Sequence, residues 1–208
     1  LYSTSPTNAV LDAVLVKISH RGRFPEGTGR WLYPDAETWG AANTFAFHGD
    51  IVINEIMYHH PPQYEPYLEN PEEWLEFYNR GAASVDLSGW KLEEGIDYTF
   101  EPGTTLGAGQ YLVVAKDKVA LAAKYPAVNI VGDYASSLSN GGELIRLVDA
   151  QKNPADEVFY RDGAPWARKA DGGGSSLELR DPRADNSVPE AWAGSLVTNS
   201  AWTNYSYT

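Results

Sequence analysis

The amino-acid sequence predicts an all-β fold, an antiparallel β-sandwich with one short helix. Short β-branched segments alternate apolar and polar residues, as half-buried strands do. Glycine, proline and asparagine turn signals recur roughly every ten residues, a spacing typical of a sandwich or barrel. A parallel α/β sheet would need a helix after nearly every strand, and the chain does not have them.

The strands of the first half are predicted from β-branched or aromatic segments that end at turn residues. We expect strands at residues 51–58, 72–78, 84–93 and 98–100. The sequence Glu-Pro-Gly-Thr at residues 101–104 suits a type II turn, because proline favours the second position and glycine the third. These segments supply the first strands of the sandwich.

The second half contains one strand, the helix and then four more strands. Residues 110–115 form the strand, and Asp117 can cap a helix at residues 118–124 that Pro126 prevents from continuing. The remaining strands are expected at residues 128–131, 143–148, 157–160 and 176–179. A single helix among so many strands keeps the predicted fold all-β.

The chain divides into a main domain and two flanking segments. We expect the sandwich at residues 48–195 and a linker or tail at residues 196–208. Residues 1–47 contain one clear strand, at residues 11–16, and then a glycine- and proline-rich stretch whose motif order parallels the end of the main domain. Such internal similarity suggests tandem domains. Residues 1–47 are therefore interpreted as the C-terminal part of a preceding similar module or an N-terminal extension, with coincidence between two loop-rich segments as the alternative.

The composition excludes several classes of protein. The 208 residues are 43% hydrophobic and 21% charged, which excludes a disordered polymer and a coiled coil. The net charge of −12 disfavours nucleic acid and anionic membranes as partners. Because cysteine is absent, disulfides and thiolate sites are excluded. No apolar run approaches the ~20 residues that cross a bilayer, and the start of the chain, without methionine or a signal pattern, suggests a piece of a longer protein.

An ordered set of short motifs along residues 51–195 resembles the lamin tail domain family, whose fold is an immunoglobulin-like β-sandwich. The order of the motifs is more specific than any one of them. Residues 20–43 also resemble the end of such a module, in agreement with a partial second copy in residues 1–47. The motifs are Ile51-Val52-Ile53-Asn54-Glu55-Ile56, Trp74-Leu75-Glu76-Phe77-Tyr78-Asn79, Val85-Asp86-Leu87-Ser88-Gly89-Trp90-Lys91-Leu92, Phe100-Glu101-Pro102-Gly103-Thr104-Thr105-Leu106, Gly109-Gln110-Tyr111-Leu112-Val113-Val114, Leu138-Ser139-Asn140-Gly141-Gly142-Glu143 and Gly174-Ser175-Ser176-Leu177-Glu178.

The resemblance implies a fold more firmly than a function. In nuclear lamins this domain is a protein-interaction module beside a long coiled coil, and this chain contains no heptad-bearing rod. The details resemble bacterial members, which are repeated modules of large exported proteins. The family pattern contains no catalytic residues, so none is transferred. The resemblance therefore implies an accessory domain without a cofactor, outside the cell or at the cell surface, that contacts neighbouring domains of its parent chain or another protein.

Two glutamates interrupt apolar strands and are the first candidates for chemistry. Strand alternation places Glu55 on the face of Ile51, Ile53 and Met57. If its strand lies beside that of Glu76, the two carboxylates could serve a glycosidase or hold a cation. Because a lone buried charge is costly, the alternative is that each carboxylate accepts hydrogen bonds or pairs with a basic side chain. We favour this structural role.

Metal signals are weaker. His59 and His60 are adjacent, so in a strand they would point to opposite faces, and a solvated loop is the favoured interpretation. Asp181 and Asp185 lie in an oxygen-rich loop and are the candidates for a structural calcium ion. The loop lacks the spacing of an EF-hand, and turn formation explains the same residues. We predict no metal centre, with structural calcium as the alternative.

Aromatic residues make up 12% of the chain, including 7 tryptophans. Trp31, Trp39, Trp166 and Trp192 lie in predicted loops, where exposed rings could bind a protein or stack on a sugar. The alternative is that these rings cover the ends of the sandwich or belong to interfaces with other domains.

The sequence therefore predicts a non-catalytic structural or interaction module of a larger, exported, multidomain bacterial protein. A carbohydrate-binding module that uses the loop aromatics is the first alternative, with glycan as its ligand. A hydrolase with a carboxylate pair is ranked last, because its glutamates lie within framework motifs.

Overall fold

The computed structural model describes residues 13–15 and 20–196. Its contacts divide the chain into two compact units, Leu1–Phe47 with Gln151–Asn153 and His48–Ala150 with Pro154–Thr208. The strand predicted at residues 11–16 falls largely outside the described residues, and residues 13–15 form no regular element. The predicted tail at residues 196–208 lies outside them as well, apart from its first residue.

The first unit contains a two-stranded antiparallel hairpin. β1 (Gly22–Phe24) pairs with β2 (Arg30–Leu32), and Arg23 lies opposite Trp31. The Arg23 guanidinium lies 4.6 Å from the centre of the Trp31 ring, a cation–π contact across the hairpin. Gly29 allows the tight connection, because a Cβ there would lie 1.8 Å from a backbone carbonyl oxygen of β1.

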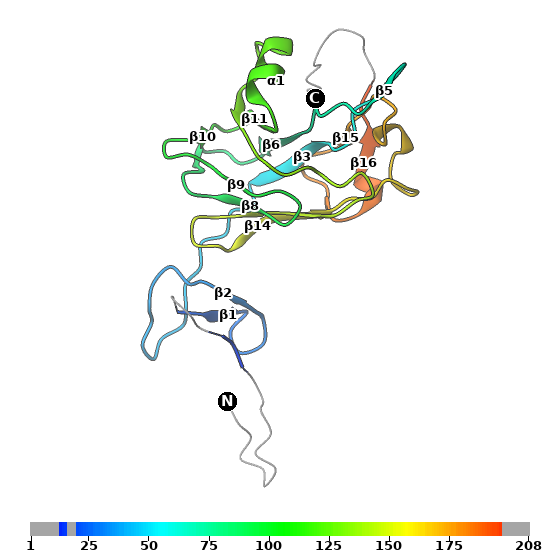
Figure 1. Cartoon of the computed structure of the whole chain (residues 1–208). Helices are drawn as coiled ribbons and strands as arrows, with labels where there is room; N and C mark the ends of the chain where they lie inside the picture. The colour runs from blue at the N-terminus through cyan, green and yellow to red at the C-terminus, as the bar shows by residue number, and fades with distance from the viewer. Residues whose placement is uncertain (1–12, 16–19, 197–208) are drawn as a thin grey trace. The chain divides into compact units, whose positions relative to one another are not determined.

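The larger sheet of the second unit has six strands in the order β12-β11-β6-β3-β15-β16 (Figure 1). Neighbouring strands run antiparallel, except β11 and β12, which run parallel. The strands are β3 (Ile51–Met57), β6 (Trp74–Asn79), β11 (Tyr111–Ala115), β12 (Ile130–Gly132), β15 (Leu177–Leu179) and β16 (Trp192–Gly194).

The second sheet has four antiparallel strands in the order β14-β13-β8-β9. Two short ribbons and two 3-10 helices complete this unit. The sheet consists of β8 (Lys91–Glu93), β9 (Tyr98–Thr99), β13 (Leu144–Val148) and β14 (Pro154–Phe159). The ribbons pair β4 (Gln63–Tyr64) with β5 (Tyr67–Leu68) and β7 (Val85–Asp86) with β10 (Thr105–Leu106), and the 3-10 helices are η1 (Arg168–Ala170) and η2 (Pro189–Ala191).

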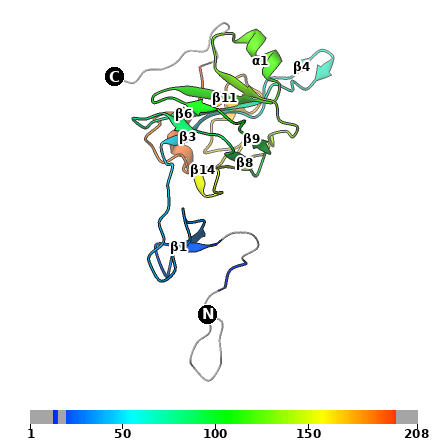
Figure 2. The ribbon, with the colours of Figure 1, turned by 90° about the vertical axis from the view of Figure 1, so that its left-hand side faces the viewer.

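The two sheets face each other across an apolar core. The views in Figures 1 and 2 place the six-stranded sheet between the helix α1 and the four-stranded sheet. Fully buried side chains come from both sheets, among them Ile53 and Phe77 from the larger one and Leu92 and Ile145 from the smaller. Their burial supplies the main stabilising free energy, at about 25 cal/mol for each Å² of apolar surface.

The α-helix forms where the sequence predicts it. α1 spans Lys118–Lys124, and Asp117 caps it by accepting a hydrogen bond from Ala120 N at 2.9 Å. Leu121 packs with Met57 and Trp74 in a second apolar cluster on the outer face of the six-stranded sheet. Because α1 connects β11 to β12, these two strands can run parallel, a local departure from the predicted antiparallel arrangement. No helix among the described residues is both long and apolar enough to cross a bilayer.

The predicted strands of the main domain are present. Where the observed strands differ from the predicted ones, the causes are local. The strand predicted at residues 84–93 is divided into β7 and β8 by Gly89, whose φ is +74°. In the predicted turn, Thr104 N donates to Glu101 O at 3.1 Å and Gly103 has a φ of +87°. Sequence alternation does not predict β4, β5 or β16, because strands of two or three residues are too short to show a period.

A β-bulge in β3 changes the face on which Glu55 lies. The register with β6 shifts between Ile53 and Glu55. Ile53 and Ile56 consequently both face the core, whereas Met57 packs under α1. The prediction that Glu55 shares a face with Ile53 is therefore wrong, because one extra residue inverts the alternation of the strand.

Asp156 of β14 bridges the two sheets. Its Oδ2 accepts hydrogen bonds from Ile53 N of β3 and from Asn186 Nδ2, each at 2.7 Å. Its Oδ1 accepts Glu157 N at 3.0 Å. Burial raises the pKa of Asp156, and these hydrogen bonds oppose that rise. Since β15 pairs with β3 at residues 55 and 56, the carboxylate satisfies a backbone N–H beyond the end of that pairing.

We expect Asp156→Ala to lower the free energy of unfolding by roughly 2–4 kcal/mol, because Ile53 N and the Asn186 amide both lose their acceptor. Urea unfolding followed by tryptophan fluorescence measures the loss. Asp97→Ala removes an exposed carboxylate and is expected to stay within about 0.5 kcal/mol of the parent. Equal losses in the two variants would contradict the role of Asp156.

Candidate functional site

Glu55 and Glu76 lie side by side on neighbouring strands. They are directly opposite each other in the antiparallel pair β3–β6, and Glu178 of β15 lies opposite Glu55 on its other side. The three carboxyl groups therefore form a row on the outer face of the six-stranded sheet. The Ser176 hydroxyl donates to Glu55 Oε1, and Asn54 Nδ2 donates to Glu76 Oε1 at 2.9 Å. Both glutamates thus accept a hydrogen bond from a neutral donor.

The surroundings of this acidic row oppose ionisation. Burial raises the pKa of Glu55 well above its usual range, the Glu76 carboxylate raises it further, and the Ser176 hydrogen bond offsets only part of the rise. Burial also raises the pKa of Glu178. Glu76 is only 2% exposed. This packing against the sheet differs from the open cleft in which two glycosidase carboxyls flank a sugar, and it supports the structural role of both glutamates.

His59 and His60 have separate partners. His59 Nδ1 lies 2.6 Å from Asp171 Oδ1, and its Nε2 lies 3.7 Å from Glu69 Oε2. His60 Nδ1 lies 2.7 Å from the Asn70 amide nitrogen, which can donate to it. Within residues 13–15 and 20–196, no three histidine, aspartate or glutamate side chains gather closely enough to hold a metal ion. The two imidazoles instead connect chain segments at the end of β3.

The calcium candidates Asp181 and Asp185 form local turns. Asp181 Oδ1 accepts Arg183 N at 2.9 Å. Asp185 Oδ1 accepts the backbone N of Ser187 at 3.0 Å and its hydroxyl at 2.6 Å, which lowers the pKa of Asp185. Both contacts run from residue i to i+2, the pattern of an Asx-turn. Structural calcium stays a prediction that these contacts do not support.

The four candidate tryptophans have different environments. Trp166 and Trp192 are buried, with ring centroids 6.0 Å apart, and Trp192 Nε1 donates to Asn186 O at 2.9 Å. Both rings belong to the main hydrophobic core. They are therefore not the exposed binding residues of the first interpretation, and their burial agrees with the alternative that they cover the sandwich. Trp31 is partly buried in β2, and Trp39 of the first unit is 91% exposed. A binding role for any of the four stays a prediction.

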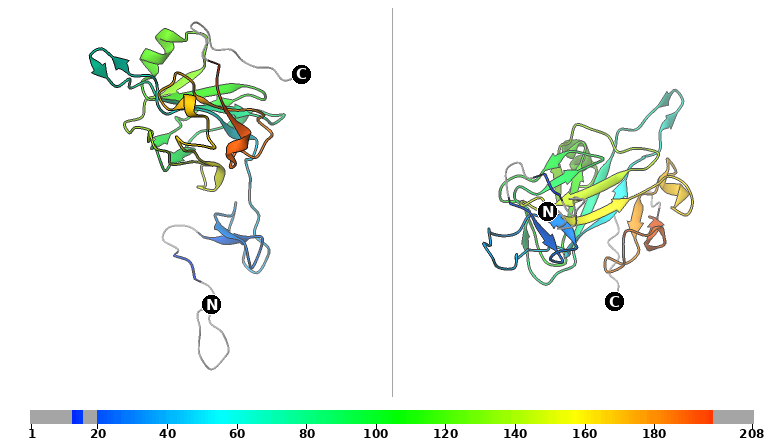
Figure 3. Two further views of the ribbon diagram at one scale, coloured as in Figure 1. Left: turned by 90° about the vertical axis from the view of Figure 1, so that its right-hand side faces the viewer. Right: turned by 90° about the horizontal axis from the view of Figure 1, so that it is seen from below.

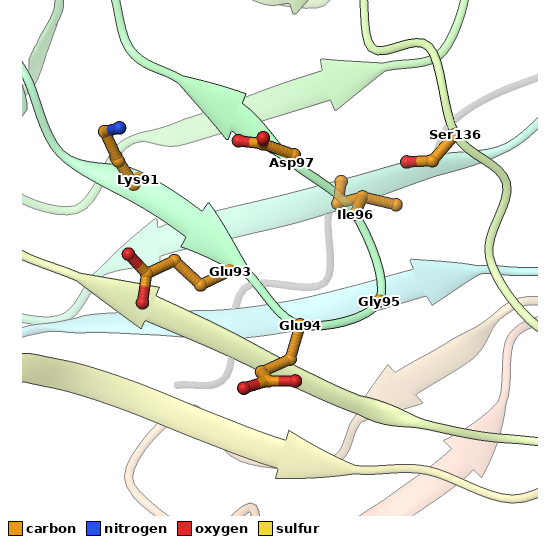
Figure 4. A pocket seen from close by; sticks show the side chains of 7 residues that line it. All are labelled: Lys91, Glu93, Glu94, Gly95, Ile96, Asp97 and Ser136. Carbon is orange, nitrogen blue, oxygen red and sulfur yellow. The ribbon is translucent and has the colours of Figure 1, made fainter.

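A surface pocket of about 410 Å³ lies beside the turn that joins β8 to β9 (Figure 4). Three of its side chains are carboxylates and one is a lysine, so its lining carries a net negative charge. None of the candidate site residues named in the sequence analysis lines this pocket. Its lining residues are Lys91, Glu93, Glu94, Gly95, Ile96, Asp97 and Ser136.

The β4–β5 hairpin is a candidate that the sequence analysis missed. It projects from the sandwich, as Figures 2 and 3 show. Tyr64, Tyr67 and Leu68 are 69%, 62% and 63% exposed, and the two tyrosine rings lie 6.5 Å apart at an angle of 62°. The available signal was a pair of aromatic residues around Pro66 in a stretch without basic residues. This signal is easily lost among the many aromatic residues of the chain.

The comparison with protein families agrees with this architecture. The family model described as the Lamin Tail Domain matches residues 46–162, more than half of the chain. The matched region includes β3, β6, the acidic pair Glu55 and Glu76, and the β4–β5 hairpin. This domain is immunoglobulin-like, a fold that is generally non-catalytic. No curated protein matches the chain.

We expect Glu55→Gln to stabilise the protein at pH 7 and to have little effect at pH 4. Because the pKa of Glu55 is raised in the folded state, stability falls as the pH rises from the unfolded value of about 4.3 through the folded one. The loss amounts to about 1.4 kcal/mol for each pH unit between the two pKa values. Denaturant unfolding across this range measures it, with Glu190→Gln, an exposed carboxyl, as control. Parallel pH profiles of parent and Glu55→Gln would contradict the assignment.

Replacing a buried and an exposed tryptophan should change the free energy of unfolding by different amounts. Trp192→Ala is expected to lower the free energy of unfolding by about 3–5 kcal/mol, because it opens a cavity among buried side chains. Trp39→Ala, at an exposed position, should change it by less than about 0.5 kcal/mol. Thermal unfolding by circular dichroism tests both. A stable Trp192→Ala variant would show that its ring is not part of the core.

Proposed function

Because the chain belongs to the lamin tail domain family, we propose that it is a non-catalytic interaction module of a larger, exported, multidomain bacterial protein. Its mechanism is the rigid presentation of loops by a closed sandwich. The observation that carries this proposal is the set of partners that the acidic and imidazole side chains have in the structure. Those singled out as catalytic candidates are held by different internal partners rather than gathered around one cleft.

The charge and composition of the chain support an interaction role. A net charge of −12 favours partners with basic surfaces. Exposed aromatic and aliphatic side chains concentrate on loops and ribbons, where a rigid scaffold can present them. Neighbouring domains of the parent chain are the first partners we propose. The motif order of residues 1–47, which parallels the end of the main domain, supports a tandem arrangement.

The geometry of the aromatic rings favours a protein partner over a glycan. A sugar-binding platform needs exposed rings that lie in one plane. The exposed pair Tyr64 and Tyr67 is inclined at 62°, and the pair Trp166 and Trp192 is buried. Trp39 is open to solvent but lies in the other compact unit. Within the described residues, this arrangement supports protein contact better than carbohydrate stacking.

Two experiments test the proposal, one on the cellular location of the protein and one on hydrolytic activity of the purified chain. Antiserum raised against this chain is expected to label intact cells of the source organism as strongly as permeabilised cells. The purified chain should not hydrolyse nitrophenyl glycosides or esters between pH 4 and 8 any faster than its Glu55→Gln and Glu76→Gln variants. Labelling confined to permeabilised cells would contradict export. Turnover that both variants lose would contradict the non-catalytic role.

A further inference from the structure

The β4–β5 hairpin exposes an apolar surface away from the sandwich. Tyr64, Tyr67 and Leu68 are each more than 60% exposed and lie within five consecutive residues. In Figure 2 the hairpin labelled β4 lies clear of both sheets. Neighbouring exposed apolar side chains of this size mark interaction surfaces, whereas isolated ones need no explanation.

Internal contacts restrict the conformation of the β4–β5 hairpin. At its base the Asn70 amide donates to His60 Nδ1 at 2.7 Å, and Asn70 Oδ1 accepts Glu72 N at 3.0 Å. Near its tip Gln63 Nε2 donates to the backbone oxygen of Glu65 at 3.1 Å. Prolines occupy positions 61, 62, 66 and 71, where they restrict the backbone. A preorganised aromatic surface loses little conformational entropy when a partner binds.

The charge around the hairpin selects the partner. Residues 61–73 contain four glutamates and no lysine or arginine. Lys124 and Lys116 pair with Glu72 and Glu73 at 2.8 and 2.9 Å. Glu65 and Glu69 lie outside these two pairs and flank the exposed rings, and the Tyr67 hydroxyl donates to Glu69. The tip therefore combines aromatic faces, one aliphatic side chain and two carboxylates. Glu69 lies 3.7 Å from His59 Nε2, and neither Glu65 nor Glu69 has a lysine or arginine partner among the described residues.

The aromatic faces and carboxylates of the tip suit an arginine side chain better than other side chains. A guanidinium group stacks on a tyrosine face and can bind a carboxylate through two parallel hydrogen bonds. Lipid is disfavoured, because insertion of the rings would bring Glu65 and Glu69 toward the bilayer. A sugar is disfavoured by the 62° angle between the rings.

We propose that the β4–β5 hairpin is a docking surface for a protein segment that presents arginine beside an apolar side chain. This inference rests on the proposed function as an interaction module and names the chemistry of the partner. Arginine stacks on Tyr64 or Tyr67 and pairs with Glu65 or Glu69, while the apolar neighbour packs on Leu68.

The test uses the full chain and three short fluorescein-labelled peptides, which alternate Arg with Leu, Glu with Leu, and Arg with Ser. Fluorescence anisotropy should show the tightest binding for the Arg–Leu peptide. The double variants Tyr64→Ser/Tyr67→Ser and Glu65→Gln/Glu69→Gln should each weaken it about tenfold or more, about 1.4 kcal/mol. Circular dichroism checks that these surface variants fold.

Two matched controls change exposed groups elsewhere on the same unit. Val119→Ser/Phe159→Ser removes two exposed apolar side chains, and Glu94→Gln/Glu190→Gln removes two exposed charges. Both should retain the parental affinity. An affinity that falls equally in controls and hairpin variants, or equal binding of the Glu–Leu peptide, would overturn the proposal.

Binding experiments with lipid vesicles and with a glycan panel test whether the hairpin binds lipid or sugar instead of protein. Phosphatidylcholine vesicles or an immobilised glycan panel that bind the parent, but not Tyr64→Ser/Tyr67→Ser, would overturn the protein partner in favour of lipid or sugar. Failure here is distinct from failure of the proposed function. Unchanged peptide affinity in the hairpin variants contradicts only the hairpin, whereas turnover by the isolated chain contradicts the non-catalytic role.

Discussion

The closure of two sheets over one apolar core is the constraint on which the other features of the second unit depend. Ile53 and Phe77 from one sheet meet Leu92 and Ile145 from the other, and a polar group at the margin of this contact needs an internal partner. Asp156 provides one by accepting the Ile53 N–H and the Asn186 amide. The carboxylate therefore completes a hydrogen-bond network that the strands alone leave open where β15 stops pairing with β3.

The filled core also leaves the acidic row on the outer face of the six-stranded sheet. Because the bulge in β3 inverts its alternation, Glu55 lies on the outer face beside Glu76 and Glu178 instead of in the core. There α1 covers the neighbouring apolar part of the sheet, at Met57 and Trp74. The acidic row is thus a consequence of register. Burial raises the pKa of Glu55 and of Glu178, and at Glu55 the neighbouring Glu76 carboxylate adds to the rise.

A filled sandwich leaves its loops and ribbons as the variable surface. The lamin tail domain match covers residues 46–162, and within it the β4–β5 hairpin lies between β3 and β6 in the chain. At the base of this hairpin, His59 contacts Glu69 and Asp171, and Asn70 contacts His60. In the proposed function, partners are recognised by the loops and ribbons that the scaffold presents, which agrees with an immunoglobulin-like fold that is generally non-catalytic.

Features that depend only on residues close together in the chain follow from the sequence. Asp117 and Pro126 bound the helix at residues 118–124, the Pro102-Gly103 pair sets a turn, and alternation places most strands within a few residues. The neighbours of each strand, the bulge that inverts one face of β3 and the covering of the aromatic rings are set by the folded arrangement instead. Trp192 looks like a loop residue in sequence but is buried against Trp166, and Tyr64 is exposed although it lies in the strand β4. Adjacency and burial depend on contacts between segments distant in the chain, and local periodicity carries no record of those contacts.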